Sequence, residues 1–123
     1  MAIVGSTIAK AYQHETTDFP GRLRVFIEFD EGNIYELPSL SGSGLTAFEG
    51  DEFTPINELG VFDELQWIEG KKLEGVFLDT SNTVIVKVMQ KMFWLEDELD
   101  QTTVVVDDCE HASQIFVLRP VSC

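Results

Sequence analysis

The sequence predicts a mainly β protein, an antiparallel sheet of about seven short strands that forms a small barrel or a sandwich, with one or two short helices. Three observations lead to this class. The chain has 123 residues, so residues 1–123 are expected to form a single domain. Short segments of alternating or β-branched apolar residues are separated by turn residues. Hydrophobic residues make up 44% of the chain, enough for a packed core.

The first predicted elements are a strand near residues 7–13 and a hairpin formed by residues 22–30 and 33–37. A two-residue turn in this hairpin would set Ile27 opposite Glu36. A three-residue loop with Gly32 in the left-handed conformation instead sets Ile27 opposite Tyr35. The second register gathers the apolar residues on one face, so we predict it.

Residues 39–55 predict a long loop, because small, polar and acidic residues and three glycines dominate the segment. Thr54 and Pro55 are typical of a helix start. A short helix is therefore expected after them, with Leu65 or Trp67 near its end.

The second half of the chain predicts a hairpin of residues 73–79 and 83–89. Residues 88–99 fit a helix or a strand. We prefer a strand followed by an acidic turn, because acidic residues at a helix C-terminus are unfavourable. The last strands are expected at residues 102–106 and 115–118, with Pro120 at a sheet edge or at the end.

Charge is the most informative property of the composition. Asp and Glu number 22 against eight Lys and Arg, a net charge of −14. Eleven acids lie between Val25 and Gly70 and seven between Met92 and Leu118, with no Lys or Arg in either stretch. This excess argues against direct binding to nucleic acid or to an anionic membrane. It favours a basic partner, unless the acidity serves only solubility.

We therefore expect an acidic inhibitor or binding protein that masks the basic cleft of a partner, such as a nuclease or a nucleic-acid-binding protein. Immunity proteins for nuclease toxins, phage anti-defence inhibitors and nucleic-acid mimics have this character. Phe48 and Phe53 are candidate apolar anchors, because acids surround them in the predicted loop. The candidate partner-binding residues are Phe48, Glu49, Asp51, Glu52, Phe53, Asp63, Glu64, Glu96, Asp97, Glu98 and Asp100.

Metal-binding patterns are weak. The acids of residues 96–100 with Asp107 and Asp108 lack the spacing of a calcium-binding EF-hand loop. Cys109 and His111 lack the usual spacing and a full ligand set for zinc. We expect no metal and no cofactor.

Catalytic patterns are equally weak. Cys109 as nucleophile with His111 as base lacks an orienting group, so a packed thiol and a surface histidine are expected. Asp79-Thr80 is similar to the active loop of aspartic proteases, but that family places Gly where this chain has Ser81. A hairpin turn with local Asp79 bonds is preferred. The glycines and serines of residues 41–44 lack the lysine of a phosphate-binding loop. We expect no catalytic residues and no enzyme.

Two other functions fit the sequence. A small-molecule binding or sequestering protein would line a pocket with Trp67, Trp94, Arg22 and Arg24. A phage structural or assembly subunit would present a large self-complementary interface, and an oligomer is compatible with the sequence.

The chain has no basic signal-peptide region and no run of about 20 apolar residues, so a cytoplasmic location is expected.

Overall fold

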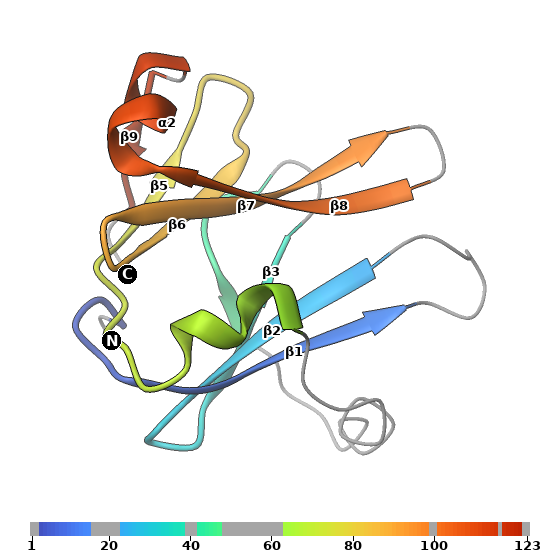
Figure 1. Cartoon of the computed structure of the whole chain (residues 1–123), viewed down its shortest axis with the longest axis vertical. Coiled ribbons are helices and arrows are strands. Elements are labelled where there is room, and N and C mark those ends of the chain that lie inside the picture. The colour runs from blue at the N-terminus through green and yellow to red at the C-terminus, as the bar shows by residue number, and fades with distance from the viewer. Residues whose placement is uncertain are drawn as a thin grey trace.

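The computed structural model describes residues 3–15, 23–38, 42–47, 63–98, 101–115 and 117–121. These residues form two antiparallel sheets, one short α-helix and one 3-10 helix (Figure 1). The first sheet has the strand order β1-β2-β3-β4 and the second has the order β8-β7-β6-β5-β9. In this part of the chain the sheets do not close into a barrel. The predicted mainly β, antiparallel fold class is confirmed.

The first sheet contains the hairpin whose register the sequence predicts. Its strands are β1 (Ile8–Glu15), β2 (Leu23–Phe29), β3 (Ile34–Leu37) and β4 (Thr46–Ala47). Ile27 lies opposite Tyr35, and Gly32 has a φ of 96°, as the three-residue loop requires. The predicted register is confirmed. Strand β4 lies within the segment expected to be a loop, and residues 39–41 and 48–55 lie outside the described residues.

The second sheet is a meander that the C-terminal segment completes. Its strands are β5 (Gly75–Leu78), β6 (Val84–Val88), β7 (Lys91–Glu98), β8 (Gln101–Asp108) and β9 (Arg119–Pro120). The predicted hairpin of residues 73–89 and the preference for a strand through Phe93 are confirmed. Between β6 and β7, Met89 and Gln90 have φ values of 53° and 64°, and this left-handed pair allows a tight turn.

The predicted strand at residues 115–118 is wrong. Helix α2 (Cys109–Ile115) follows β8 directly, and the short strand β9 comes after it. The helix starts here because Asp108 caps it, its Oδ1 accepting a 2.6 Å hydrogen bond from the His111 backbone N–H. Pro120 does lie in an edge strand, as expected.

A 3-10 helix, η1 (Asp63–Ile68), precedes β5 and contains Leu65 and Trp67. The segment where the helix after Pro55 is expected to start lies outside the described residues. None of the helices in the described part of the chain has the length and apolar character needed to cross a membrane.

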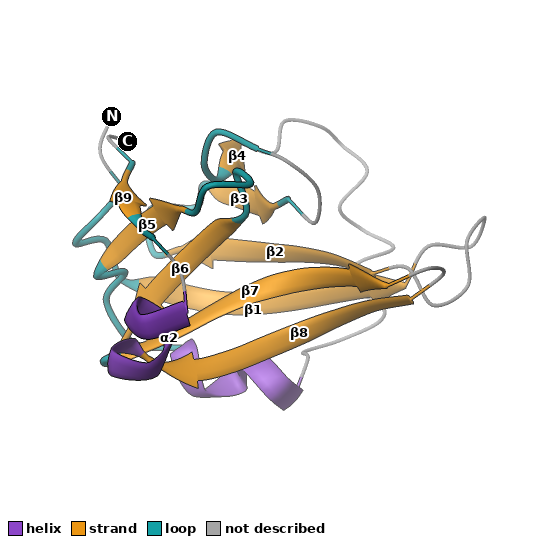
Figure 2. Cartoon of the chain, turned by 90° about the horizontal axis from the view of Figure 1, so that it is seen from above, coloured by secondary structure: helices purple, strands orange, loops and turns teal. Residues whose placement is uncertain are grey.

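Both faces of the second sheet are packed. Along β7, successive side chains point to opposite faces. Phe93 joins the main core between the two sheets, whereas Trp94 joins a smaller cluster beneath α2 with Ile85, Met92 and Ala112 (Figure 2). Burying one such aromatic side chain contributes about 1.5–3 kcal/mol. Packing on both faces therefore holds β7 firmly in place. The main core contains Ile8, Val25, Ile27, Phe29, Leu65, Ile68, Val84, Val86 and Leu95, among others.

Candidate partner-binding surface

Strand β7 carries opposite charges at its two ends. Lys91 is its first residue, and Glu96, Asp97 and Glu98 are its last three. At about 3.3 Å per residue, the two ends are roughly 20–25 Å apart. Figures 1 and 2 both show the acidic end on the same side of the molecule as the ends of β1 and β2 that face away from the termini. Three of the predicted contact residues are thus brought together at the far end of the β7–β8 hairpin.

Hydrogen bonds fix two of these carboxylates. The Trp94 Nε1 donates a 3.0 Å hydrogen bond to Glu96 Oε1. Across the hairpin, the Thr102 hydroxyl donates to Asp97 Oδ1, and Thr102 is only 2% exposed. Because these side chains are already ordered, a partner would lose less conformational entropy on binding them.

The second acidic stretch of the sequence is divided in space. Lys91 pairs with Asp108 and Glu98 pairs with Gln101, so Asp107 and Asp108 lie at the opposite end of the hairpin from Glu98. Segments that are close in sequence therefore form two separate acidic groups. Only the group at residues 96–98 belongs to the predicted contact surface.

Several acids of the first stretch have structural contacts. Glu36 forms two 2.9 Å hydrogen bonds with the guanidinium of Arg24. Glu69 Oε2 accepts a hydrogen bond from the Ala11 backbone N–H at 3.1 Å. Glu28 accepts one from the Tyr12 hydroxyl at 3.0 Å. Burial, followed by this bond to Glu28, raises the pKa of Tyr12 to about 12. These acids help to hold the first sheet together.

The remaining predicted contact residues are placed only in part. Asp63 and Glu64 begin η1, on a different element from the acids of β7. Phe48, Glu49, Asp51, Glu52, Phe53 and Asp100 lie outside the described residues. The aromatic anchors of the sequence hypothesis therefore stay a prediction.

The total charge nevertheless sets the electrostatics of the surface. The 22 acids outnumber the eight bases by fourteen, so ion pairs within the chain cannot neutralise them. Such an excess produces a negative potential that attracts cationic surfaces over a Debye length of about 8–10 Å.

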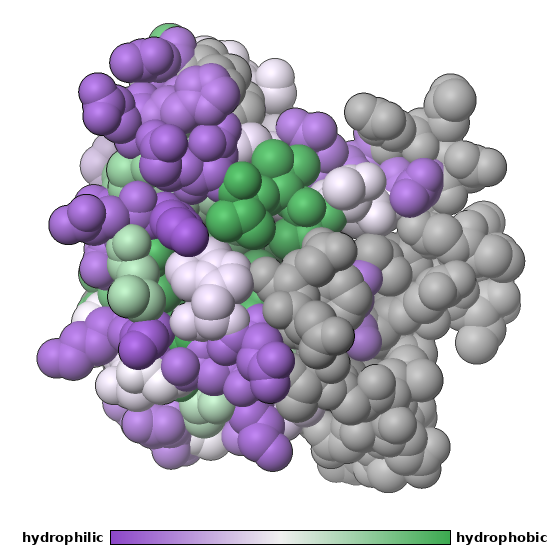
Figure 3. Space-filling model, viewed as in Figure 1, coloured by the Kyte–Doolittle hydropathy of each residue, from purple (hydrophilic) through white to green (hydrophobic). Residues whose placement is uncertain are grey.

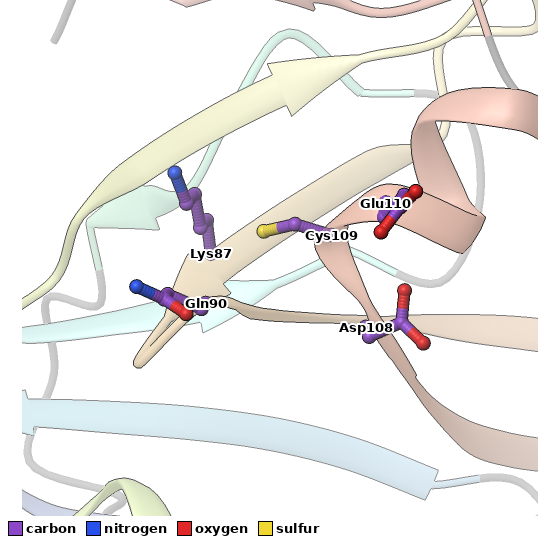
Figure 4. A pocket seen from close by; sticks show the side chains of 5 residues that line it. All are labelled: Lys87, Gln90, Asp108, Cys109 and Glu110. Carbon is purple, nitrogen blue, oxygen red and sulfur yellow. The ribbon is translucent and has the colours of Figure 1, made fainter.

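A shallow pocket of about 440 Å³ lies where α2 meets the β6–β7 turn (Figure 4). The Cys109 sulfur points toward Lys87 and Gln90, whereas the carboxylates of Asp108 and Glu110 point away from them. Burial raises the pKa of the Cys109 thiol; the Lys87 ammonium opposes this effect, and Glu74 and Asp108 add to it. A thiol that stays protonated is a poor nucleophile.

Cys109 and His111 do not form a nucleophile–base pair. His111 Nδ1 lies 2.6 Å from Asp107 Oδ2, so the histidine has an orienting carboxylate. Residues two apart on a helix do not face each other, however, and the thiol points into the pocket. The described residues also contain no group of three or more His, Cys, Asp or Glu side chains that could hold a metal ion.

The residues of the hypothetical small-molecule pocket do not converge. Trp67 packs edge-on against Phe93 with ring centroids 6.0 Å apart, on the main-core face of β7. Trp94 lies on the other face and is 3% exposed. Arg24 is held by Glu36, and Arg22 lies outside the described residues.

Asp79 is a turn residue. Its Oδ1 accepts 2.8 Å hydrogen bonds from the backbone N–H groups of Ser81 and Thr83. The side chain is therefore engaged by the hairpin between β5 and β6. The local-turn interpretation of this segment is confirmed, and the similarity to aspartic proteases is accounted for by turn chemistry.

Sequence reasoning misses one surface feature, an apolar area over β8 (Figure 3). Val106 is 39% exposed, and Val104 and Val105 are half-buried. A run of three valines indicates a strand, but it does not tell which strand of the sheet is the edge. Only the strand order reveals that these valines are at an edge.

Comparison with protein-family models, curated proteins and solved structures finds no match for this chain. Its charges, contacts and sheet edges are therefore the observations from which a function can be inferred.

Proposed function

We propose that this protein binds a basic partner protein and masks its cationic cleft, as an inhibitor does. The observation that carries the proposal is the excess of fourteen acids over bases, which leaves a large negative charge after every internal ion pair that the chain could form. Glu96, Asp97 and Glu98 add a local focus at the far end of the β7–β8 hairpin, where two of them are held by hydrogen bonds.

A nuclease or another nucleic-acid-binding protein is the favoured class of partner. Such proteins line their clefts with Lys and Arg to neutralise phosphates. Ordered carboxylates at one end of a hairpin can take the place of those phosphates. The long-range attraction would raise the rate of association, and salt would reduce it.

The proposal is tested by capture of partners from the source cell with the tagged chain, at low and at high salt. We expect basic proteins to be retained at about 0.05 M salt and released at about 0.5 M, because the Debye length falls from roughly 14 Å to roughly 4 Å. Retention of acidic or neutral proteins, with no effect of salt, would contradict the proposal.

A pair of variants then locates the charge that matters. Glu96→Gln with Glu98→Gln removes two charges at the hairpin end, and glutamine keeps an acceptor for Trp94. Asp30→Asn with Glu31→Gln removes the same charge from the exposed loop between β2 and β3. We expect the first pair to weaken binding of the captured protein about tenfold and the second by much less. Equal effects would mean that net charge alone, and not the β7 end, governs binding.

A further inference from the structure

The inference concerns the outer edge of β8, and it rests on the proposed function. Strand β8 is the terminal strand of the second sheet, and β7 pairs with it along all eight residues without a register shift. Within the part of the chain that the structure describes, no strand pairs with its other side.

The other three sheet edges are protected in recognisable ways. On β1, the backbone N–H of Ile8 donates to the carbonyl of Lys71, and the Glu69 carboxylate accepts a hydrogen bond from the N–H of Ala11. Strand β4 has only two residues, and β9 has two, one of which is Pro120. Short strands, proline and covering segments are the usual means of preventing strand addition. Strand β8 is long and regular, and it contains neither Pro nor Lys.

The backbone groups that face outward on β8 can be assigned. The Cys109 N–H donates to the Gln90 carbonyl, so this pair is hydrogen-bonded. Because hydrogen-bonded and non-hydrogen-bonded pairs alternate in an antiparallel ladder, Val104 and Val106 direct their N–H and C=O groups away from β7. Asp108 also faces outward, but its N–H already donates to Asp107 Oδ1 at 2.9 Å and its side chain caps α2. Thr102 is buried and the Asp108 N–H is already bonded, so the accessible part of the edge runs from Thr103 to Asp107.

Charge determines which strand fits this edge. Asp107 and Asp108 flank the valines at one end, and exposed Glu96 on β7 lies opposite Thr103 at the other. Lys91 lies opposite Asp108, Lys87 and Glu110 line the same pocket as Asp108, and His111 is held by Asp107. A second copy added antiparallel would bring its aspartates toward Glu96, and both chains carry a charge of −14. A strand with cationic ends and an apolar middle avoids the repulsion between aspartates and Glu96.

We propose that β8 binds its basic partner by strand addition: an extended segment of the partner, apolar in the middle and with Lys or Arg at both ends, pairs with Val104–Asp107 and lengthens the second sheet. Main-chain bonds to Val104 and Val106 would supply affinity, and the flanking acids would supply charge selectivity. The apolar area over β8 in Figure 3 would be covered by the added strand.

The test uses a synthetic peptide of about ten residues, with lysine and arginine at both ends and alternating valine and threonine between them. A second peptide has glutamate in place of each basic residue. Two variants of the chain have the same net charge: Val106→Pro removes one outward N–H, and Val106→Thr keeps that N–H and nearly the same shape. Circular dichroism and thermal melting establish that both variants are folded. Binding is measured by fluorescence anisotropy.

We expect the basic peptide to bind the native chain and the Val106→Thr variant similarly, and the Val106→Pro variant about tenfold more weakly. Amide hydrogen exchange of the native chain provides a readout that needs no variant. The added strand should protect the amides of Val104 and Val106, whereas the amide of Val105 already bonds to β7.

The outcomes separate this inference from the proposed function. Equal binding of the basic peptide to the proline and threonine variants, without new amide protection, would overturn strand addition and leave the proposed function standing. Equal binding of the acidic and basic peptides would contradict the proposed function as well. Self-association of the native chain that Val106→Pro abolishes would show that the occupant is a second copy, and would overturn the choice of a basic strand.

Discussion

Replacement of Asp79 by alanine should destabilise the protein measurably. The Asp79 side chain is 6% exposed and accepts two backbone hydrogen bonds of 2.8 Å in the turn between β5 and β6. A hydrogen bond to a charged group contributes about 1.5–3 kcal/mol. Ser81 is exposed, so water can replace its lost bond, whereas Thr83 is half-buried and its N–H would lose more. We expect a loss of about 2–4 kcal/mol in the free energy of unfolding.

Urea unfolding followed by tryptophan fluorescence is a suitable assay, because both tryptophans report on the second sheet. Trp94 lies in β7, and Trp67 packs against Phe93 of the same strand. With a slope of about 1–3 kcal/mol per molar urea, Asp79→Ala should lower the midpoint by roughly 1–3 M. Asp79→Asn is the matched control, because its side-chain oxygen can accept the same bonds without the charge. It should cost only about 1 kcal/mol. Equal losses in the two variants, or a midpoint shift below about 0.5 M for alanine, would refute this account of the turn.

Two further predictions concern Tyr12 and the turn between β6 and β7. Absorbance titration of a Tyr35→Phe variant, which isolates Tyr12, should give a pKa of about 12, and Glu28→Gln should lower it toward the ordinary value of 10.0. Because the pKa of Tyr12 is higher in the folded state than in the unfolded state, the neutral hydroxyl stabilises the fold below pH 10, and this contribution is lost as the pH rises toward 12. Unchanged stability across this pH range would contradict the raised pKa of Tyr12. Met89→Asn combined with Gln90→Gly should stabilise the protein by about 1 kcal/mol in thermal melts, since both positions have positive φ, whereas Met89→Val should destabilise it.

The first hairpin shows what could be predicted from sequence. Alternating apolar residues and a single well-placed Gly32 leave one register that buries Ile27 and Val25 together. The tight turn at Met89 and Gln90 offers no such signal, because neither residue is typical of positive φ. It forms because β6 and β7 gain more from pairing and packing than the turn costs.

The region after β8 shows how an apolar run misleads. Residues 115–118 read as a strand, yet Ile115 ends a helix that Asp108 caps. Asp107-Asp108 ahead of Cys109 was a usable N-cap signal, but only seven residues follow it in the helix, so periodicity is weak.

The candidate surface was predictable in its charge and not in its layout. The count of acids can be read from composition, and the cluster at residues 96–98 is contiguous in sequence. The separation of Asp107 and Asp108 from that cluster depends on hairpin register. The accessibility of β8 depends on the strand order of the whole sheet, which no local pattern encodes.

The two ends of the described chain are hydrogen-bonded to the same short stretch, residues 73–76. Gly5 donates a backbone hydrogen bond to Leu73, and Val121 donates one to Val76. Figures 1 and 2 place both ends of the described chain on the side of the molecule away from the end of β7. A tether at either terminus would therefore present the acidic hairpin end outward, so an immobilised chain is displayed in one useful orientation. Because Gly5 and Val121 bond to residues only three apart, a linker between these two segments has the geometry that circular permutation tolerates.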